Sequence, residues 1–322
     1  MTLITNTEIR HKQISLRSTF TTALRSVDHL DVIEFVINGI HVGQTVATPA
    51  ITGDSHDAII RDLSAIELEG REISDLDQFN SELQRYSITQ SAKAAIDMAL
   101  YSMLHGDFPS CRVKSDVTIP IAPISEYPRL IEARKDFAAL KIKLDKAPIE
   151  DALEKIATVR ELCPDKHIRI DPNQSWTLDD SISFINAMEE IDVVIDYLEQ
   201  PTPRADFTAL RELRRSGSIP IMADESCFTQ VDLDRLIDLE AIDYVNLKIL
   251  KNGGMTEVLA LADRARAEGI EVSIGSMMEG GIGIRAAAHL ASIIAPSAIH
   301  DLDAAWWHAE SSATYRDGFI VT

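Results

Sequence analysis

From about residue 117 to residue 302 the chain repeats one unit, a short run rich in Val and Ile followed by an amphipathic stretch. Eight runs end at intervals of 22 to 28 residues, each about the length of one strand and one helix. The pattern predicts an α/β fold of the (β/α)7β type, which is a TIM barrel without its last regular helix. The predicted strands end at Ile121, Lys143, Asp171, Glu199, Asp224, Lys248, Gly275 and Asp301.

The ends of the amphipathic stretches carry signals that helices begin and stop there. Pro148 precedes one stretch, and Thr177 and Thr229 can cap the N-termini of two others. Gly269 follows the stretch 255–268, where a helix C-terminus is expected. These positions predict helices between the strands.

The first 116 residues follow a different pattern, which predicts an α+β capping domain over residues 1–116 ahead of a barrel over 117–302. Three alternating segments predict a β-meander and two periodic segments predict helices: 3–17, 31–39, 40–48, 74–85 and 89–105. The tail 303–322 is too short for a full barrel helix, and we expect it to pack against the capping domain.

Charge and composition limit the partners of the protein. The 322 residues carry a formal net charge of −20, so nucleic acid and anionic membrane surfaces would repel the chain. No signal peptide or bilayer-spanning run is recognisable, and Cys111, Cys163 and Cys227 lack CxxC spacing. We therefore expect a cytoplasmic protein with reduced thiols and no membrane partner; a homo-oligomer remains open.

Three acidic residues end consecutive predicted strands: Asp171, Glu199 and Asp224. The carboxyl ends of barrel strands meet at one mouth, where the active sites of this fold lie. Each acid alone could simply cap a following helix. Three carboxylates at one mouth repel one another unless a cation joins them, and all-oxygen ligation suits Mg²⁺. The sequence predicts one Mg²⁺ per subunit on these residues.

Two lysines end predicted strands two and six, which lie on opposite sides of an eight-stranded ring. Lys143 and Lys248 would therefore face each other across whatever the metal holds, although a single lysine at a strand end is usually a solvated ion-pair partner. The facing pair suits a 1,1-proton transfer, in which one lysine removes a proton and the other returns it on the opposite face. Lys141 shares the face of Lys143, because strand residues two apart point the same way.

Asp301 and Asp303 place two carboxylates on one face of the last predicted strand, across the ring from the metal. They could start a polar loop, bind a second metal or bind a substrate ammonium. A free amino acid has its ammonium and carboxylate on one carbon and could not span the mouth. A dipeptide could, so a small dipeptide is the expected substrate.

Five motifs of the chain resemble the enolase superfamily, in its muconate-lactonising subgroup: KIK (141–143), DPNQSW (171–176), LEQP (198–201), ADES (223–226) and NLKILKNGG (246–254). The resemblance implies a metal held by Asp171, Glu199 and Asp224, and acid/base catalysis by Lys143 and Lys248. The asparagines of these motifs, Asn173 and Asn246, are expected to lie directly behind the metal ligands.

Further motifs resemble the dipeptide epimerases of this subgroup. DLD (301–303) is similar to a DxD motif whose aspartates hold the substrate ammonium, and Lys141 is expected to bind the substrate carboxylate. FTTALRSV (20–27) and ITGDS (51–55) resemble Ala-Glu epimerases, in which the arginine at the position of Arg25 binds the glutamate side chain. The resemblance implies epimerisation of L-Ala-D/L-Glu in the recycling of peptidoglycan peptides.

Other functions remain open on the same scaffold. N-acylamino acid racemases, o-succinylbenzoate synthases and muconate cycloisomerases share the acids and lysines, but their substrates lack a free ammonium and leave Asp301 and Asp303 without a task. A Schiff-base aldolase would need one lysine and no acid triad. A non-catalytic barrel would not need any of these residues.

Overall fold

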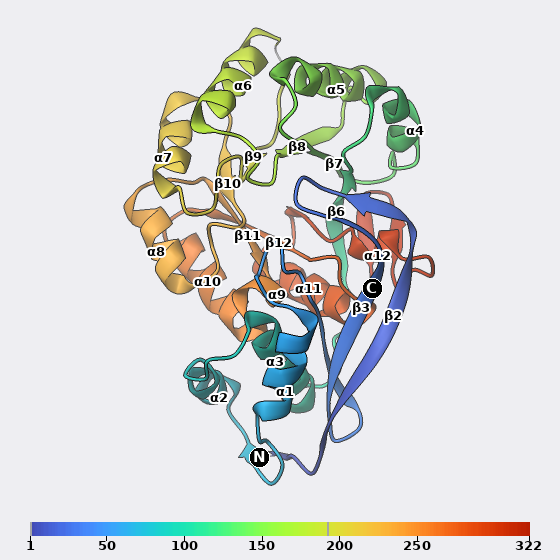
Figure 1. Ribbon diagram of the computed structural model, residues 1–322, viewed down its shortest axis with the longest axis vertical. Coiled ribbons are helices and arrows are strands. Elements are labelled where there is room, and N and C mark those ends of the chain that lie inside the picture. Colours follow the sequence, from blue (N-terminus) through green and yellow to red (C-terminus); the bar gives the residue numbers. More distant parts are fainter. Residues whose placement is uncertain (1, 192) are drawn as a thin grey trace.

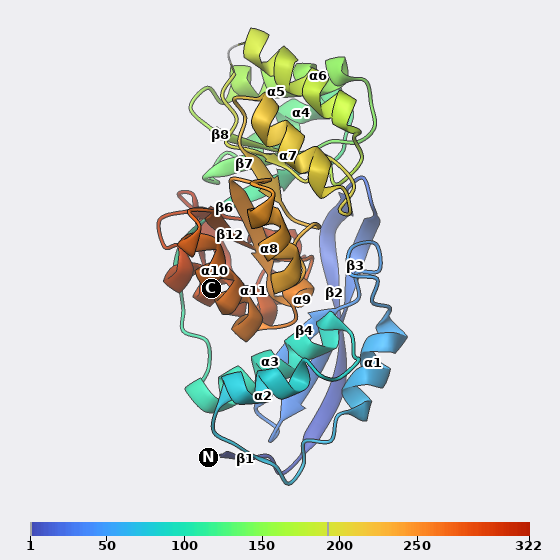
Figure 2. The ribbon, with the colours of Figure 1, turned by 90° about the vertical axis from the view of Figure 1, so that its left-hand side faces the viewer.

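The computed structural model describes residues 2–191 and 193–322 and has two parts (Figure 1). A parallel barrel of strands and outer helices forms one part, and a smaller α+β cap lies against its mouth (Figures 1 and 2). The predicted TIM barrel with a capping domain is confirmed. Each part has its own cluster of buried apolar side chains, and the barrel cluster also takes in residues of the cap.

In the part of the chain that the structure describes, eight strands close the barrel. Neighbouring strands from β6 to β12 pair in chain order, and β13 pairs in parallel with β6. A bridge from Gly275 to Asp301 joins the end of β12 to the segment after β13. The predicted strand ends lie within two residues of the observed ones: β6 (Arg112–Ile119), β7 (Ala139–Lys143), β8 (His167–Asp171), β9 (Leu198–Glu199), β10 (Ile221–Ala223), β11 (Tyr244–Lys248), β12 (Glu271–Gly275) and β13 (Ile299–His300).

Helices fill the intervals between the strands, as predicted. Thr177 and Thr229 form capping boxes at the starts of α6 and α8, Pro148 is the N-cap residue of α5, and Gly269 follows α10 with φ of 76°. The helices are α4 (Tyr127–Glu132), α5 (Ile149–Leu162), α6 (Leu178–Glu190), α7 (Phe207–Ser216), α8 (Gln230–Asp238), α9 (Ile249–Asn252), α10 (Met255–Ala267), α11 (Gly281–Ile294) and α12 (Ala304–Trp307). A short 3₁₀ turn, Ile124–Glu126, precedes α4.

The cap is an antiparallel meander packed against helices. Strands β2, β3 and β4 pair in chain order, and α3 lies across β4, where a Cβ at Gly43 would lie 1.8 Å from the Ala95 oxygen. The sequence analysis did not predict α1, although Ser55 caps its N-terminus by accepting from the Ala58 nitrogen. The cap elements are β1 (Thr2–Leu3), β2 (Thr7–Thr21), β3 (Ser26–Ile37), β4 (His41–Val46), α1 (His56–Ala65), β5 (Glu72–Ile73), α2 (Leu76–Leu83) and α3 (Gln90–His105).

The structure changes two details of the predicted organisation. The first barrel strand begins at Arg112, ahead of the predicted boundary at residue 116. The tail contacts both parts: Leu16 of β2 bridges to His308, whereas β14 (Thr314–Arg316) and β15 (Phe319–Val321) form a hairpin that extends the barrel sheet beside β6. The tail therefore joins the cap to the barrel.

Two contacts place the cap over the barrel mouth. The side-chain oxygen of Gln44 in β4 accepts from the Ile282 nitrogen at the start of α11, at 3.0 Å. Within the cap, the Gln44 amide nitrogen donates to Glu34, which orients this side chain. The tip of the β2–β3 hairpin reaches the end of β6, where the Ile121 nitrogen donates to the Thr21 oxygen. Over the described residues, no helix combines the length and apolarity needed to cross a bilayer.

Candidate active site

The three predicted metal ligands lie at the barrel mouth. Asp171 ends β8, Glu199 ends β9 and Asp224 directly follows β10, so three neighbouring parallel strands deliver them to one edge. All three side chains are buried, with at most 1% of each residue exposed. Buried carboxylates are unfavourable unless positive charge or hydrogen bonds compensate them.

A lysine contacts each of these carboxylates. Lys143 pairs with Asp171, Lys141 Nζ lies 3.2 Å from Glu199 Oε2, and Lys248 Nζ lies 2.6 Å from Asp224 Oδ2. Within residues 2–191 and 193–322 no three acidic, His or Cys side chains surround one metal-sized point. Each acid pairs with a lysine, and burial together with the neighbouring Asp171 and Asp224 raises the pKa of Glu199 above its ordinary value. The ammonium groups neutralise an all-oxygen donor set that a divalent cation fits by charge and by ligand type.

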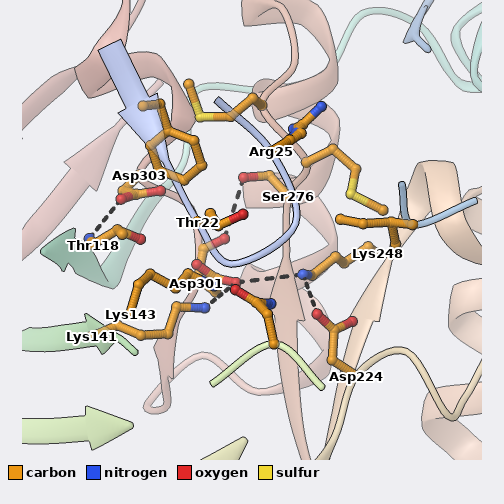
Figure 3. A pocket seen from close by; sticks show the side chains of 15 residues that line it. Thr22, Arg25, Thr118, Lys141, Lys143, Asp224, Lys248, Ser276, Asp301 and Asp303 are labelled. Atoms are coloured by element: carbon orange, nitrogen blue, oxygen red, sulfur yellow. Dashed lines mark hydrogen bonds and ion pairs between the residues drawn. The ribbon is translucent and has the colours of Figure 1, made fainter. Parts of the chain in front are cut away.

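Lys143 and Lys248 enter one cavity from opposite sides in Figure 3. Lys143 ends β7 and Lys248 ends β11, four strands further round the barrel. Burial alone would lower the pKa of Lys248, but the facing carboxylates of Asp224 and Asp301 raise it above its ordinary value. Burial also opposes the charge of Lys141, whose pKa Asp301 and Glu199 raise well above the usual range.

Asp301 and Asp303 both lie at the barrel mouth, but they do not lie on one strand. Strand β13 ends at His300, and the two side chains both line the cavity that the lysines enter. Asp301 Oδ2 lies 2.6 Å from Lys141 Nζ and 3.8 Å from Lys248 Nζ. Strand β13 lies four strands from β9 round the barrel, so Asp301 faces Glu199 across the mouth, and Lys141 contacts both. The prediction of two carboxylates on one strand face is wrong, because the chain leaves the extended conformation: Asp303 has φ −87° and ψ −5° at the start of α12.

Hydrogen bonds from the protein hold one carboxylate oxygen of Asp303, and the other oxygen can bind a ligand. Asp303 Oδ2 accepts from the Thr118 nitrogen at 2.7 Å and from Trp307 Nε1 at 3.1 Å. The hydrogen bonds of the described residues leave Oδ1 without a protein partner, and the side chain lines the same cavity as both lysines (Figure 3). This carboxylate can accept a cationic group of a ligand.

Asn173 and Asn246 hydrogen-bond to the acids. Asn246 Nδ2 donates to Glu199 Oε1 at 2.8 Å and to Asp301 Oδ2 at 3.2 Å. The Asn173 nitrogen donates to Asp171 Oδ1 at 2.8 Å, and its side-chain amide donates to Glu225 Oε1 at 3.3 Å. Both asparagines therefore orient carboxylates at the mouth.

The sequence reasoning missed two buried charged residues beside the site, although both lie in the quoted motifs. Burial and the neighbouring Asp224 and Asp171 carboxylates raise the pKa of Glu225, in ADES, to about 8. Lys251, in NLKILKNGG, is fully buried and contacts Asp224. Their adjacency to Asp224 and Lys248 in the chain was the available signal.

Arg25 brings a positive charge from the cap to the cavity. It lies in the turn between β2 and β3, where the Thr22 nitrogen donates to the Arg25 oxygen at 2.9 Å. In the described part of the chain no carboxylate pairs with its guanidinium, and burial lowers the pKa of Arg25 to about 10. Figure 3 shows Arg25 above Ser276, on the side away from Asp303. A half-buried guanidinium that has no ion-pair partner among the described residues is suited, at a cavity wall, to an anionic ligand group.

Comparisons with known proteins agree with this arrangement. The family model "Enolase C-terminal domain-like" matches residues 126–322. An L-Ala-D/L-Glu epimerase of Clostridium acetobutylicum is 30% identical over 90% of this chain and 87% of its own length, and a hydrophobic dipeptide epimerase of Enterococcus faecalis is 34% identical over 94% and 90%. The substrate-liganded L-Ala-D/L-Glu epimerase of Bacillus subtilis superposes with a TM-score of 0.92 at 27% identity and covers 100% of this chain and 96% of its own.

Proposed function

The chain belongs to the enolase C-terminal domain-like family, and from this premise we propose that it is a dipeptide epimerase, an isomerase that inverts the α-carbon of the C-terminal residue. The observation that carries the proposal is the placement of Lys143 and Lys248 on strands β7 and β11, with both side chains in one cavity above three buried acids. This placement supports proton removal from one face of a carbon and proton return on the other.

The acids supply the setting for this proton transfer. In the proposal Asp171, Glu199 and Asp224 hold one Mg²⁺, as Mg accompanies the dipeptide in the structure of the similar epimerase from Enterococcus faecalis. When bound, the ion supplies positive charge where a second negative charge develops on the substrate carboxylate. Lys141 and Asn246 hold Glu199 in position, and Asp301 contacts both of them.

Three residues define the proposed substrate. The free oxygen of Asp303 binds the ammonium of the N-terminal residue, Lys141 lies close enough to the acids to bind the substrate carboxylate, and Arg25 binds an acidic side chain on the C-terminal residue. L-Ala-D/L-Glu meets these requirements. With L-Ala-D/L-Glu as the substrate, we further propose that the enzyme acts in the cytoplasm in the recycling of peptidoglycan peptides.

Deuterium exchange tests the proposal. With Mg²⁺ and L-Ala-L-Glu in D₂O, we expect deuterium at the glutamate α-carbon and accumulation of the epimer, followed by mass spectrometry and NMR. A panel of dipeptides with acidic, basic and apolar C-terminal residues maps the preference, and no exchange with any member would remove the proposed activity.

N-acylamino acid racemisation is the alternative on the same scaffold, and Asp303 decides between the two. A buried carboxylate with an unpaired oxygen at the cavity wall is unfavourable beside an acyl group but favourable beside an ammonium. We therefore expect faster exchange with a dipeptide than with its N-acetyl derivative, measured with both substrates in the same assay.

A further inference from the structure

Lys251 is a buried cation outside the proton-transfer pair. It lies on α9, three residues after Lys248, and none of its surface is exposed. An ammonium group without solvent strongly destabilises a fold unless its donors are all satisfied. Burying a neutral side chain of similar volume at this position would require less free energy, so the charge of Lys251 points to a role beyond packing.

All three donors of Lys251 are used on the two strands that carry Asp224 and Lys248. Its Nζ donates to Asp224 O at 2.6 Å, to Asn246 O at 2.8 Å and to Asp224 Oδ1 at 2.8 Å. Two of these acceptors are main-chain carbonyls at neighbouring strands of the mouth. Lys251 thus fixes the distance between the end of β10 and β11 at the point where the site is built.

Because of the third contact, the two carboxylate oxygens of Asp224 have different lysine partners. Oδ1 faces Lys251, whereas Oδ2 faces the cavity and lies 2.6 Å from Lys248 Nζ. Burial opposes the charge on Asp224, and Lys248 and Lys251 together hold its pKa below the ordinary range. One carboxylate oxygen is therefore held away from the cavity, and the other is presented to it.

The same turn orients Lys248. The Lys248 nitrogen donates to Asn252 Oδ1 at 2.9 Å, and the Asn252 amide donates to the Cys227 and Phe228 oxygens, both at 3.0 Å. Helix α9 is consequently tied to the loop after β10 by two side chains, Lys251 and Asn252. A change at Lys251 would loosen Asp224 and the Lys248 side of the cavity, but not Lys143 on β7.

We propose that Lys251 is a positioning residue that fixes Asp224 as a one-oxygen metal ligand and holds Lys248 on its side of the substrate. The role of Lys251 in holding Lys248 rests on the proposed epimerase function, whereas its role in fixing Asp224 does not. Measuring Mg²⁺ affinity tests the role at Asp224 without turnover.

The test compares Lys251→Met, which keeps the stem and removes the charge, with Lys155→Met, which removes a mostly buried lysine of α5 away from the mouth. Calorimetric titration with Mg²⁺ measures affinity in the absence of substrate. We expect a Kd about 10- to 100-fold weaker in Lys251→Met and an unchanged Kd in Lys155→Met, as for other residues that orient metal ligands. Equal Kd values in wild type and Lys251→Met overturn the proposal.

A second measurement separates positioning from general damage. Exchange in D₂O is followed from each isomer, and Lys143→Ala and Lys248→Ala identify which isomer each lysine serves. Exchange on the Lys248 side should fall at least about tenfold further than exchange on the Lys143 side. Equal losses on both sides overturn the proposal, whereas absence of exchange in the wild type removes the epimerase function and leaves the metal test valid.

Folding is checked by circular dichroism before either assay. If Lys251→Met does not fold, Lys251→Gln replaces it, because an amide retains two donors and loses the charge; the same Kd increase is expected. If neither variant folds, Lys251 serves the fold and the proposal fails.

Discussion

Lys143 and Lys248 are the side chains on which the proposed proton transfer depends. Replacing either by Ala removes the acid/base group on one face of the substrate, so epimerisation should fall by about 10³-fold or more. Exchange of the hydrogen that faces the remaining lysine can continue, and assays from each isomer in D₂O detect it. The control is Lys146→Ala, an exposed lysine in the loop after β7. A rate near that of the wild type in either variant contradicts the two-base scheme.

Arg25 should determine the preference for an acidic C-terminal residue. Its guanidinium lines the cavity without an ion-pair partner in the described chain, so Arg25→Gln removes a charge that only the substrate would neutralise. A charge-assisted hydrogen bond contributes about 1.5–3 kcal/mol, which corresponds to a loss of roughly 10- to 100-fold in kcat/KM for L-Ala-Glu. L-Ala-Leu is the internal control, since its side chain has no carboxylate. A parallel loss with both substrates would exclude this role.

Asp303 should recognise the ammonium through one oxygen. Asp303→Asn can keep the hydrogen bonds from the Thr118 nitrogen and Trp307 Nε1 through its amide oxygen, while the charge is lost. We expect kcat/KM for the dipeptide to fall by about 100-fold, since a charged partner is removed, and that of the N-acetyl analogue to change little. Steady-state kinetics on both substrates checks this. Similar losses for the two would indicate a structural role.

At the scale of elements, sequence periodicity predicted the barrel because each strand is buried and each helix is amphipathic. The strands that end at Lys143, Asp171, Glu199, Lys248 and Gly275 end at the predicted residue. The prediction was wrong after β13, where the extended run stops at His300 and Asp303 begins a helix. A two-residue strand is too short to show a period from which its end could be predicted.

The Gly253–Gly254 pair shows a second limit of sequence reasoning. Both glycines have positive φ, of 88° and 142°, and a Cβ on Gly254 would lie 2.7 Å from Asp97 Cγ of cap helix α3. The contact joins residues far apart in the chain, so no local pattern predicts it. The ion pairs of Lys141, Lys248 and Lys251 likewise depend on which strands become neighbours.

Asp97 links α3 of the cap to the first turn of α10. Its Oδ2 accepts from the Met255 nitrogen at 2.6 Å and its Oδ1 from Thr256 Oγ1 at 2.6 Å. Burial raises the pKa of Asp97 from 3.8 to about 6, and the nearby Glu257 adds to this. The folded state therefore binds this proton more tightly than the unfolded chain, and Asp97 stabilises the fold less as the pH rises from about 4 to about 6.

Asp97→Asn should remove this pH dependence. The difference in unfolding free energy between wild type and Asp97→Asn should fall by up to about 3 kcal/mol from pH 4 to pH 7, because one pKa unit corresponds to about 1.4 kcal/mol. Urea unfolding at several pH values gives the unfolding free energy of both proteins. The contributions of the other carboxylates are the same in both, so they cancel when the two free energies are subtracted. A constant or rising difference would contradict the buried, weakly acidic state of Asp97.

At the scale of the whole molecule, the active site is assembled from both parts. Six barrel strands contribute charged side chains, and the cap contributes Arg25 from a hairpin turn that only the docking of the two parts places there. The sequence predicted which barrel residues meet, because strand order in a barrel follows the chain. It could not predict which lysine pairs with which carboxylate, because these ion pairs depend on how far each side chain reaches across the mouth.

Mg²⁺ should stabilise the folded molecule, because only the folded chain brings Asp171, Glu199 and Asp224, the proposed ligands, to one barrel mouth. A ligand bound only by the folded state adds about 3 kcal/mol when its concentration is a hundred times Kd, so the thermal midpoint should rise by several degrees. The net charge of −20 also attracts divalent cations non-specifically, which would raise the midpoint without a site. Asp171→Asn separates specific from non-specific binding. It removes one of the three proposed ligands, but it changes the net charge of −20 by only one unit. Differential scanning calorimetry with and without Mg²⁺ should show a rise in the wild type that Asp171→Asn largely loses; an equal rise in both would mean that the acids do not bind the ion.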